Sequence, residues 1–123
     1  MGKEITELMI KTSYDLAKKV YFEEIELSNA LSKITEKSGM HRGFALAYVS
    51  AFRCLMSGSV YSRMMKATAT RYYLYKIYED FGLEFLKDAL KAVNLHIEHY
   101  RKIYNKDLRS IIKVVDEIKL KHS

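Results

Sequence analysis

Hydrophobic side chains recur at every third or fourth position along most of the chain, which is the spacing of an amphipathic helix. The pattern predicts helices over about 5–20, 27–37, 42–56, 67–81 and 83–103, and a last one from 107 into a basic C-terminal end. The segment 42–56 is apolar on nearly all sides, so we expect it to be central. With no proline and no β-branched clusters, the sequence predicts an all-α compact bundle of about six helices, forming a single domain over 1–123.

Helix boundaries are marked by a few residues with special backbone or capping properties. Gly39 follows the second segment and can adopt the left-handed conformation that ends a helix. Ser28 and Asp107 carry side chains that can cap the second and the last helix. Gly58 interrupts the third segment, so we expect a short irregular or single-turn link before the fourth helix.

Positive charge is concentrated in the middle of the sequence. The 42 residues between Glu36 and Glu79 contain seven Lys and Arg, six Tyr and no acidic residue, whereas residues 1–40 and 79–123 are each nearly neutral. A basic segment without competing carboxylates, rich in hydroxyl donors, is typical of a surface that binds phosphates. The predicted contact residues are Arg42, Arg53, Tyr61, Arg63, Lys66, Arg71, Tyr72, Tyr75 and Lys76. Tyr61 and Arg63 are expected to project from the irregular link.

The start of the third helix has two interpretations. Free backbone N–H groups after His41, reinforced by Arg42, can bind one phosphate. Alternatively, His41 caps the helix. The sequence does not decide between these interpretations.

Features that could support catalysis or metal binding are sparse. His96 and His99 lie three residues apart, whereas a zinc helix usually spaces its histidines by four and needs a third ligand. A histidine packed or hydrogen-bonded near a helix surface is the simpler interpretation. Cys54 lies in an apolar stretch, where a buried thiol is common. We therefore predict no enzyme activity, no metal and no cofactor.

The setting of the protein is predicted from its composition. The single Cys54 cannot form an internal disulfide, and no apolar run reaches the roughly 18 residues that span a bilayer. The N-terminal residues lack the apolar core of a secretion signal. These features predict a cytoplasmic protein without membrane contact.

Several short motifs are spread over residues 27–100. They include Ser38-Gly39-Met40, Met56-Ser57-Gly58-Ser59-Val60-Tyr61-Ser62-Arg63, Thr70-Arg71-Tyr72-Tyr73-Leu74, Ile77-Tyr78-Glu79-Asp80-Phe81-Gly82 and Leu95-His96-Ile97-Glu98-His99-Tyr100. Through them the chain resembles a small helical accessory module found alongside HNH-type nuclease domains in bacterial and phage restriction-like proteins. The resemblance implies contact with DNA rather than RNA, in phage or bacterial defence. The chain itself has no nuclease motif, so a free-standing copy could hold DNA or act on a protein that does.

A protein-interaction module is the alternative hypothesis. Apolar residues cover most of the third predicted helix, and Phe85, Ala89, Ala92 and Ile103 form a second stripe on the fifth. This apolar surface favours a homodimer, or a partner protein, such as a nuclease, that the chain binds or inhibits. Binding to nucleic acid should weaken steeply with salt, whereas such an interface should respond little.

Overall fold

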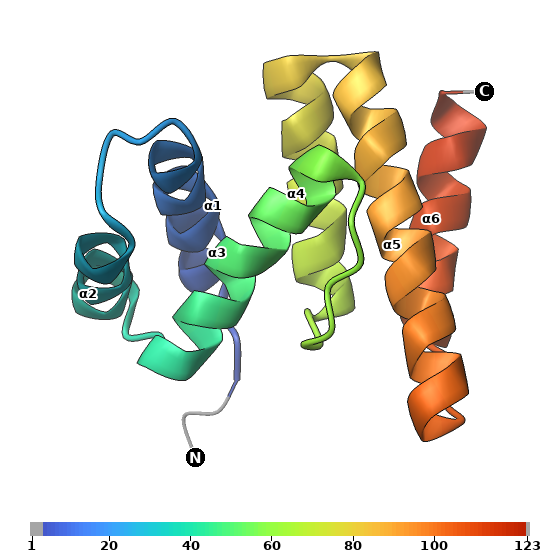
Figure 1. The fold of residues 1–123 in the computed structure, drawn as a ribbon, viewed down its shortest axis with the longest axis horizontal. Helices are drawn as coiled ribbons and strands as arrows, with labels where there is room; N and C mark the ends of the chain where they lie inside the picture. The colour runs from blue at the N-terminus through green and yellow to red at the C-terminus, as the bar shows by residue number, and fades with distance from the viewer. Residues whose placement is uncertain (1–3, 123) are drawn as a thin grey trace. The chain divides into compact units, whose positions relative to one another are not determined.

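The computed structural model describes residues 4–122, which form six α-helices and no strand. The all-α prediction is confirmed. The helices are α1 (Glu7–Tyr21), α2 (Leu27–Ser38), α3 (Arg42–Ser57), α4 (Ala67–Phe81), α5 (Leu83–Tyr104) and α6 (Arg109–Lys121) (Figure 1). The chain consists of two compact units, Met1–Arg53 and Cys54–Ser123. Helix α3 begins in the first unit and ends in the second. That 1–123 forms a single domain stays a prediction.

Helix boundaries agree with the predictions to within about two residues, but two predicted caps are wrong. Gly39 ends α2 with φ of 78°, as expected. Ser28 lies inside α2, whose N-cap is Glu26. Asp107 precedes Leu108, the N-cap of α6, and its carboxylate instead accepts a 3.1 Å hydrogen bond from Arg101 Nε. Both cap predictions relied on side-chain type, and each polar side chain found a different partner.

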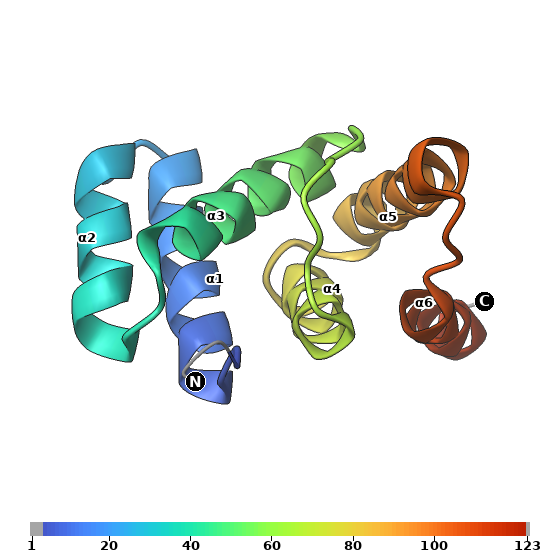
Figure 2. The same cartoon turned by 90° about the horizontal axis from the view of Figure 1, so that it is seen from below.

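In the first unit, α1 and α2 lie side by side, as both views show (Figures 1 and 2). The buried ring of Tyr14 on α1 meets Phe52 of α3 edge-on, with centroids 5.4 Å apart. Ser13 Oγ lies 3.2 Å from the Met40 sulfur inside the same core. On α3, Phe44 remains 38% exposed, so the apolar helix keeps one open edge.

In the second unit, α4 and α5 form an antiparallel pair, and α6 packs against both (Figure 2). The turn between α4 and α5 is a single residue, Gly82, whose φ of 95° lies in the left-handed region that favours glycine. The core is filled by buried side chains from all three helices. They are Tyr73, Leu74, Ile77, Leu86, Val93, Ile111, Val115 and Ile118.

The described part of the chain contains no helix with both the length and the apolar character needed to cross a bilayer. Its helices bury one face each and leave the other to solvent, and the polar faces carry the side chains discussed below.

Candidate nucleic-acid interface

The predicted contacts on the first unit are Arg42 and Arg53, both exposed on α3. The Arg42 guanidinium donates to the Ser32 hydroxyl at 3.0 Å and to the hydroxyl and carbonyl oxygens of Ser28 at 3.2 and 3.3 Å. These bonds connect α3 to α2 within the unit. Arg42 therefore has a structural role here, although its charge is not neutralised by the serines.

His41 caps α3 through its side chain. Its Nδ1 atom accepts a hydrogen bond of 3.1 Å from the Gly43 backbone N–H. This N–H is one of those that a phosphate at the helix start would need. The sequence left open whether His41 caps the helix or a phosphate binds there, and in the structure His41 forms the cap.

The prediction that Tyr61 projects from the irregular link is wrong, because its side chain is only 5% exposed. Its ring stacks on His96 of α5, with centroids 4.1 Å apart and planes 7° from parallel. Burial raises the pKa of the Tyr61 phenol far above its ordinary value. Tyr61 is thus unavailable to a ligand in this structure, whereas Arg63 and Lys66 of the same link are exposed.

On α4 the predicted residues meet α6. Arg71 Nε donates to Glu117 Oε2 at 2.9 Å, and the Tyr75 hydroxyl donates to the same oxygen at 2.7 Å. The Arg71 guanidinium carbon lies 5.0 Å from the Tyr75 ring centroid, and Lys121 Nζ lies 5.5 Å from it. We call Arg71, Tyr75, Glu117 and Lys121 the α4–α6 cluster. It places two cations and a phenol around one carboxylate.

The α4–α6 cluster is open to solvent, because Arg71 and Glu117 keep 52% and 37% of their side-chain surface exposed. The Tyr75 hydroxyl, followed by Arg71, holds the pKa of Glu117 below its usual range. One turn along α4, Lys76 Nζ lies 3.1 Å from Glu79 Oε1, and this bond raises the pKa of Lys76. Tyr72 is half-buried between these positions.

Sequence reasoning missed Glu117 and Lys121. Both lie on one face of α6, and four-residue spacing adds Lys113 to that face. The spacing is visible in the sequence, but the facing of α6 toward α4 is not. The sequence analysis described the end of this helix only as basic, whereas the ring of His122 lies 4.3 Å, centroid to centroid, from the ring of Tyr78. Because Arg71 and Tyr75 contact Glu117 and Tyr78 contacts His122, α4 and α6 run parallel.

The histidine pair of α5 does not build a metal site. His96 is fully buried, with Nδ1 against the backbone carbonyl of Tyr61, in agreement with the packed and hydrogen-bonded interpretation. Within residues 4–122 no group of three or more His, Cys, Asp or Glu side chains is arranged to hold a metal ion.

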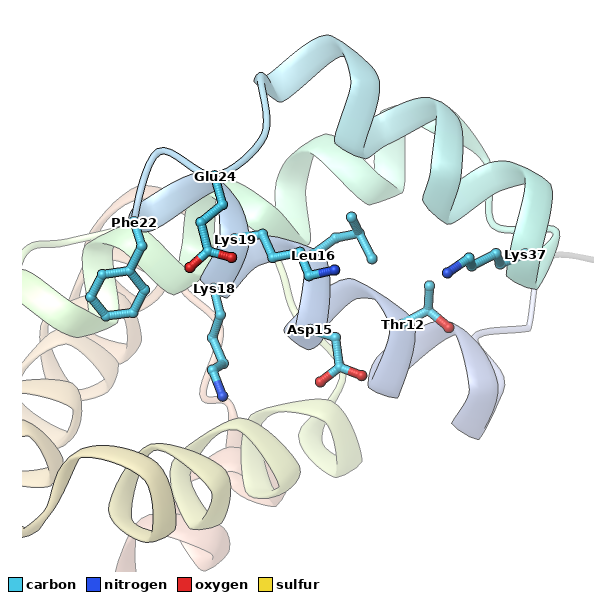
Figure 3. A pocket seen from close by; sticks show the side chains of 8 residues that line it. All are labelled: Thr12, Asp15, Leu16, Lys18, Lys19, Phe22, Glu24 and Lys37. Carbon is cyan, nitrogen blue, oxygen red and sulfur yellow. The ribbon is translucent and has the colours of Figure 1, made fainter.

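A groove of about 520 Å³ lies in the first unit between α1 and α2 (Figure 3). Lys19 and Lys37 reach along it, whereas Lys18 and Asp15 point away from α2 (Figure 3). Lys19 and Lys37 point toward one another, but Asp15 and Lys18 do not, so the charged side chains are not all aimed at one point (Figure 3). This arrangement does not support a catalytic constellation, which requires groups aimed at a common reacting atom.

The second unit carries most of the charge. It has 13 Lys and Arg against 8 Asp and Glu, a net charge of +5, while the first unit has 8 against 7, a net charge of +1. The seven bases that the sequence places in the middle of the chain are divided almost equally, with three in the first unit and four in the second. Comparisons of the chain with protein families, with curated proteins and with solved structures found no match.

Proposed function

We propose that this chain is a non-catalytic module that binds duplex DNA through the α4–α6 cluster of its second unit. One observation carries the proposal: Arg71 and Tyr75 direct their donors at a single anionic oxygen, Glu117 Oε2. A phosphate oxygen is recognised by the same donor types at the same distances. Glu117 thus occupies the position in which a backbone phosphate would be held.

The surroundings of this site support contact with phosphate rather than stacking on bases. Stacking needs an open aromatic platform, and Arg71 and Lys121 already lie over the Tyr75 ring. Duplex DNA presents regularly spaced phosphates and no free base faces. The resemblance to modules that accompany HNH-type nucleases favours DNA over RNA.

Further cations of the second unit extend the proposed contact surface. Lys113 lies on the same face of α6 as Glu117, and Arg63 and Lys66 are exposed in the link that leads into α4. With a net charge of +5, the unit attracts a polyanion at a distance, before any specific contact forms. Tyr72 and Lys76 would lie at the edge of such a contact.

The proposal is tested by fluorescence anisotropy with a labelled mixed-sequence duplex at low salt. The double variant Arg71→Gln/Lys121→Gln removes both cations of the α4–α6 cluster, and we expect it to bind about tenfold or more weakly. The matched control Lys11→Gln/Lys33→Gln removes two exposed cations of the first unit. Because it changes net charge equally, it separates the site from general attraction, and we expect less than about threefold loss.

Salt dependence provides an independent measurement. For about four phosphate contacts, the affinity should fall roughly 100-fold between 50 and 200 mM salt. Equal losses in the two double variants, or no duplex binding at low salt, would contradict the proposal. Tighter binding to a single strand of the same length would replace duplex DNA with single-stranded nucleic acid as the ligand.

A second candidate function, a protein-interaction module, is favoured by a shallow groove in the second unit. Its volume is about 390 Å³, and it is lined by Leu90 and Leu95, by three cations and by one carboxylate, namely Lys87, Lys91, Lys119 and Glu98. Leu120, next to Lys119, is 83% exposed. Such a groove suits a partner with carboxylates around an apolar segment. Size-exclusion chromatography with light scattering tests the homodimer form of this candidate, because a monomer at about 100 μM would exclude a stable dimer.

A further inference from the structure

Residues 58–66 connect α3 to α4 without helical structure, and one residue anchors this link on α5. Tyr61 is buried, its ring stacked on His96, and its backbone carbonyl faces His96 Nδ1. Met65, later in the link, is also buried. The contact between Tyr61 and His96 therefore holds the middle of the link on α5.

Only the neutral form of His96 suits this contact. With its proton on Nδ1, the imidazole donates to the Tyr61 carbonyl, and Nε2 keeps a lone pair. Nε2 is buried and has no hydrogen-bond partner among residues 4–122. Protonation would place a second N–H and a full charge at this position. A buried donor without an acceptor and a buried charge without a partner both cost free energy.

The groups around His96 do not offset that cost. The aromatic neighbours of His96 are Tyr61 and Tyr100, whose ring centroid lies 5.0 Å away. Cys54, in the last turn of α3, adds to the rise in the pKa of Tyr61 and brings no opposite charge to His96. His99, three residues along α5, opposes a charge on His96 when it is itself protonated. Burial, the largest cause, lowers the pKa of His96, and the bond to the Tyr61 carbonyl only partly offsets it.

We propose that His96 is a pH-sensitive latch: the neutral imidazole holds residues 58–66 on α5, and protonation releases them. The undocked link leaves His96 in water, where it takes up a proton near its ordinary pKa of about 6.5. The open state therefore binds more protons than the docked state. The free energy of docking is fully present above that pKa and is lost as the pH falls through it.

Release of the link would expose Tyr61 and Met65 and would free the segment that carries Arg63 and Lys66. It is a local opening, which needs less free energy than unfolding of the whole unit. The latch does not depend on DNA binding. It rests on the buried contact between the link and α5.

Amide hydrogen exchange, measured by mass spectrometry at pH 7.5 and 5.5 and corrected for the intrinsic effect of pH, tests the latch. We expect protection in residues 58–66 of the wild-type chain to fall about fivefold to tenfold at pH 5.5, with less than about threefold change in α6. In His96→Asn, the side-chain amide can still donate to the Tyr61 carbonyl but does not titrate. We expect less than about threefold change in that variant, whereas the control His99→Asn should behave like the wild type.

Unchanged protection of residues 58–66 in the wild-type chain would overturn the latch, and so would an undiminished fall in His96→Asn. If His96→Asn does not fold, NMR titration of the wild-type imidazoles decides the matter. A His96 that titrates at or above pH 6.5 would overturn the proposal. A lower midpoint, accompanied by shifts of the Tyr61 amide, would support it.

Discussion

Two tyrosines of the second unit lie beside ionisable groups in opposite surroundings. Tyr61 is 5% exposed and stacks on the fully buried His96. Tyr75 is half-buried at the surface, where its hydroxyl and Arg71 donate to Glu117. Tyr61 joins residues 58–66 to α5, and Tyr75 joins α4 to α6. They differ in whether water can replace the contacts.

The difference separates a structural role from the binding role that we propose for the α4–α6 cluster. Around Tyr61, the partners cannot be exchanged without exposing the core, so the contact holds the link in place and responds to a proton. Around Tyr75, a ligand oxygen can replace Glu117 with little change in packing, because the carboxylate is exposed and solvated. The inward tyrosine supports the fold, and the outward one carries part of the phosphate contact that we propose.

The largest expected difference between the two tyrosines is in stability. Tyr61→Ala removes a buried ring and the stacking on His96, and should lower the free energy of unfolding by about 3–5 kcal/mol. Tyr75→Ala, the same change at the surface, should cost about 1 kcal/mol or less. Urea denaturation followed by circular dichroism measures both values. Equal losses would mean that burial does not distinguish the two positions.

A second difference is the pH range in which each cluster loses stability. His96 has a lowered pKa, so the unfolded chain binds its proton more readily and stability falls as the pH drops below about 6.5. Glu117 also has a lowered pKa, so its contribution is present above the ordinary carboxylate value of about 4.3 and is lost as the pH falls below it.

Denaturation curves between pH 8 and 3 separate these two losses. His96→Asn should remove the loss at higher pH, and Glu117→Gln the loss at lower pH. We expect the first loss to be the larger, because His96 is buried and Glu117 is exposed. If His96→Asn leaves the loss between pH 7 and 5 intact, another group causes it.

Local signals predicted most of the fold. Helical spacing and nearby glycines determine the boundaries of α2 and α4, and both matched the expectation closely. The wrong caps at Ser28 and Asp107 show the limit of local reasoning, since each side chain bonds a residue that only the folded chain brings near. The helices were predictable because their periodicity is a property of neighbouring residues.

The candidate site was only half predictable, because it joins distant segments. Arg71 and Tyr75 were among the predicted contacts, but their partner Glu117 is 46 residues from Arg71 and lies on another helix. Tyr61 was assigned to the surface because its segment lacks helical structure. Its burial depends on packing against α5, for which the link carries no periodic signal.

An intermediate effect is expected when the carboxylate of the α4–α6 cluster is neutralised. Glu117→Gln removes the charge that competes with phosphate while keeping an oxygen near Arg71 and Tyr75. Duplex affinity at 50 mM salt should increase about threefold to tenfold in fluorescence anisotropy. The control Glu36→Gln neutralises an exposed carboxylate of the first unit and should give a smaller gain. An unchanged affinity in Glu117→Gln would remove Glu117 from the proposed phosphate position.

The smallest expected effect is the response of the ion pair to salt. Arg71→Gln breaks the contact with Glu117, and its small loss of stability should disappear between 20 mM and 1 M NaCl, because exposed charges are screened over a few ångströms at the higher concentration. The loss caused by Tyr61→Ala should persist at both concentrations, since it arises from packing. Parallel urea denaturation of the two variants and the wild type measures this contrast. If the loss in Arg71→Gln survives 1 M salt, the guanidinium stabilises the unit through its contact with the Tyr75 ring rather than through charge. The α4–α6 cluster would then resemble the buried contact between Tyr61 and His96, which also depends on packing.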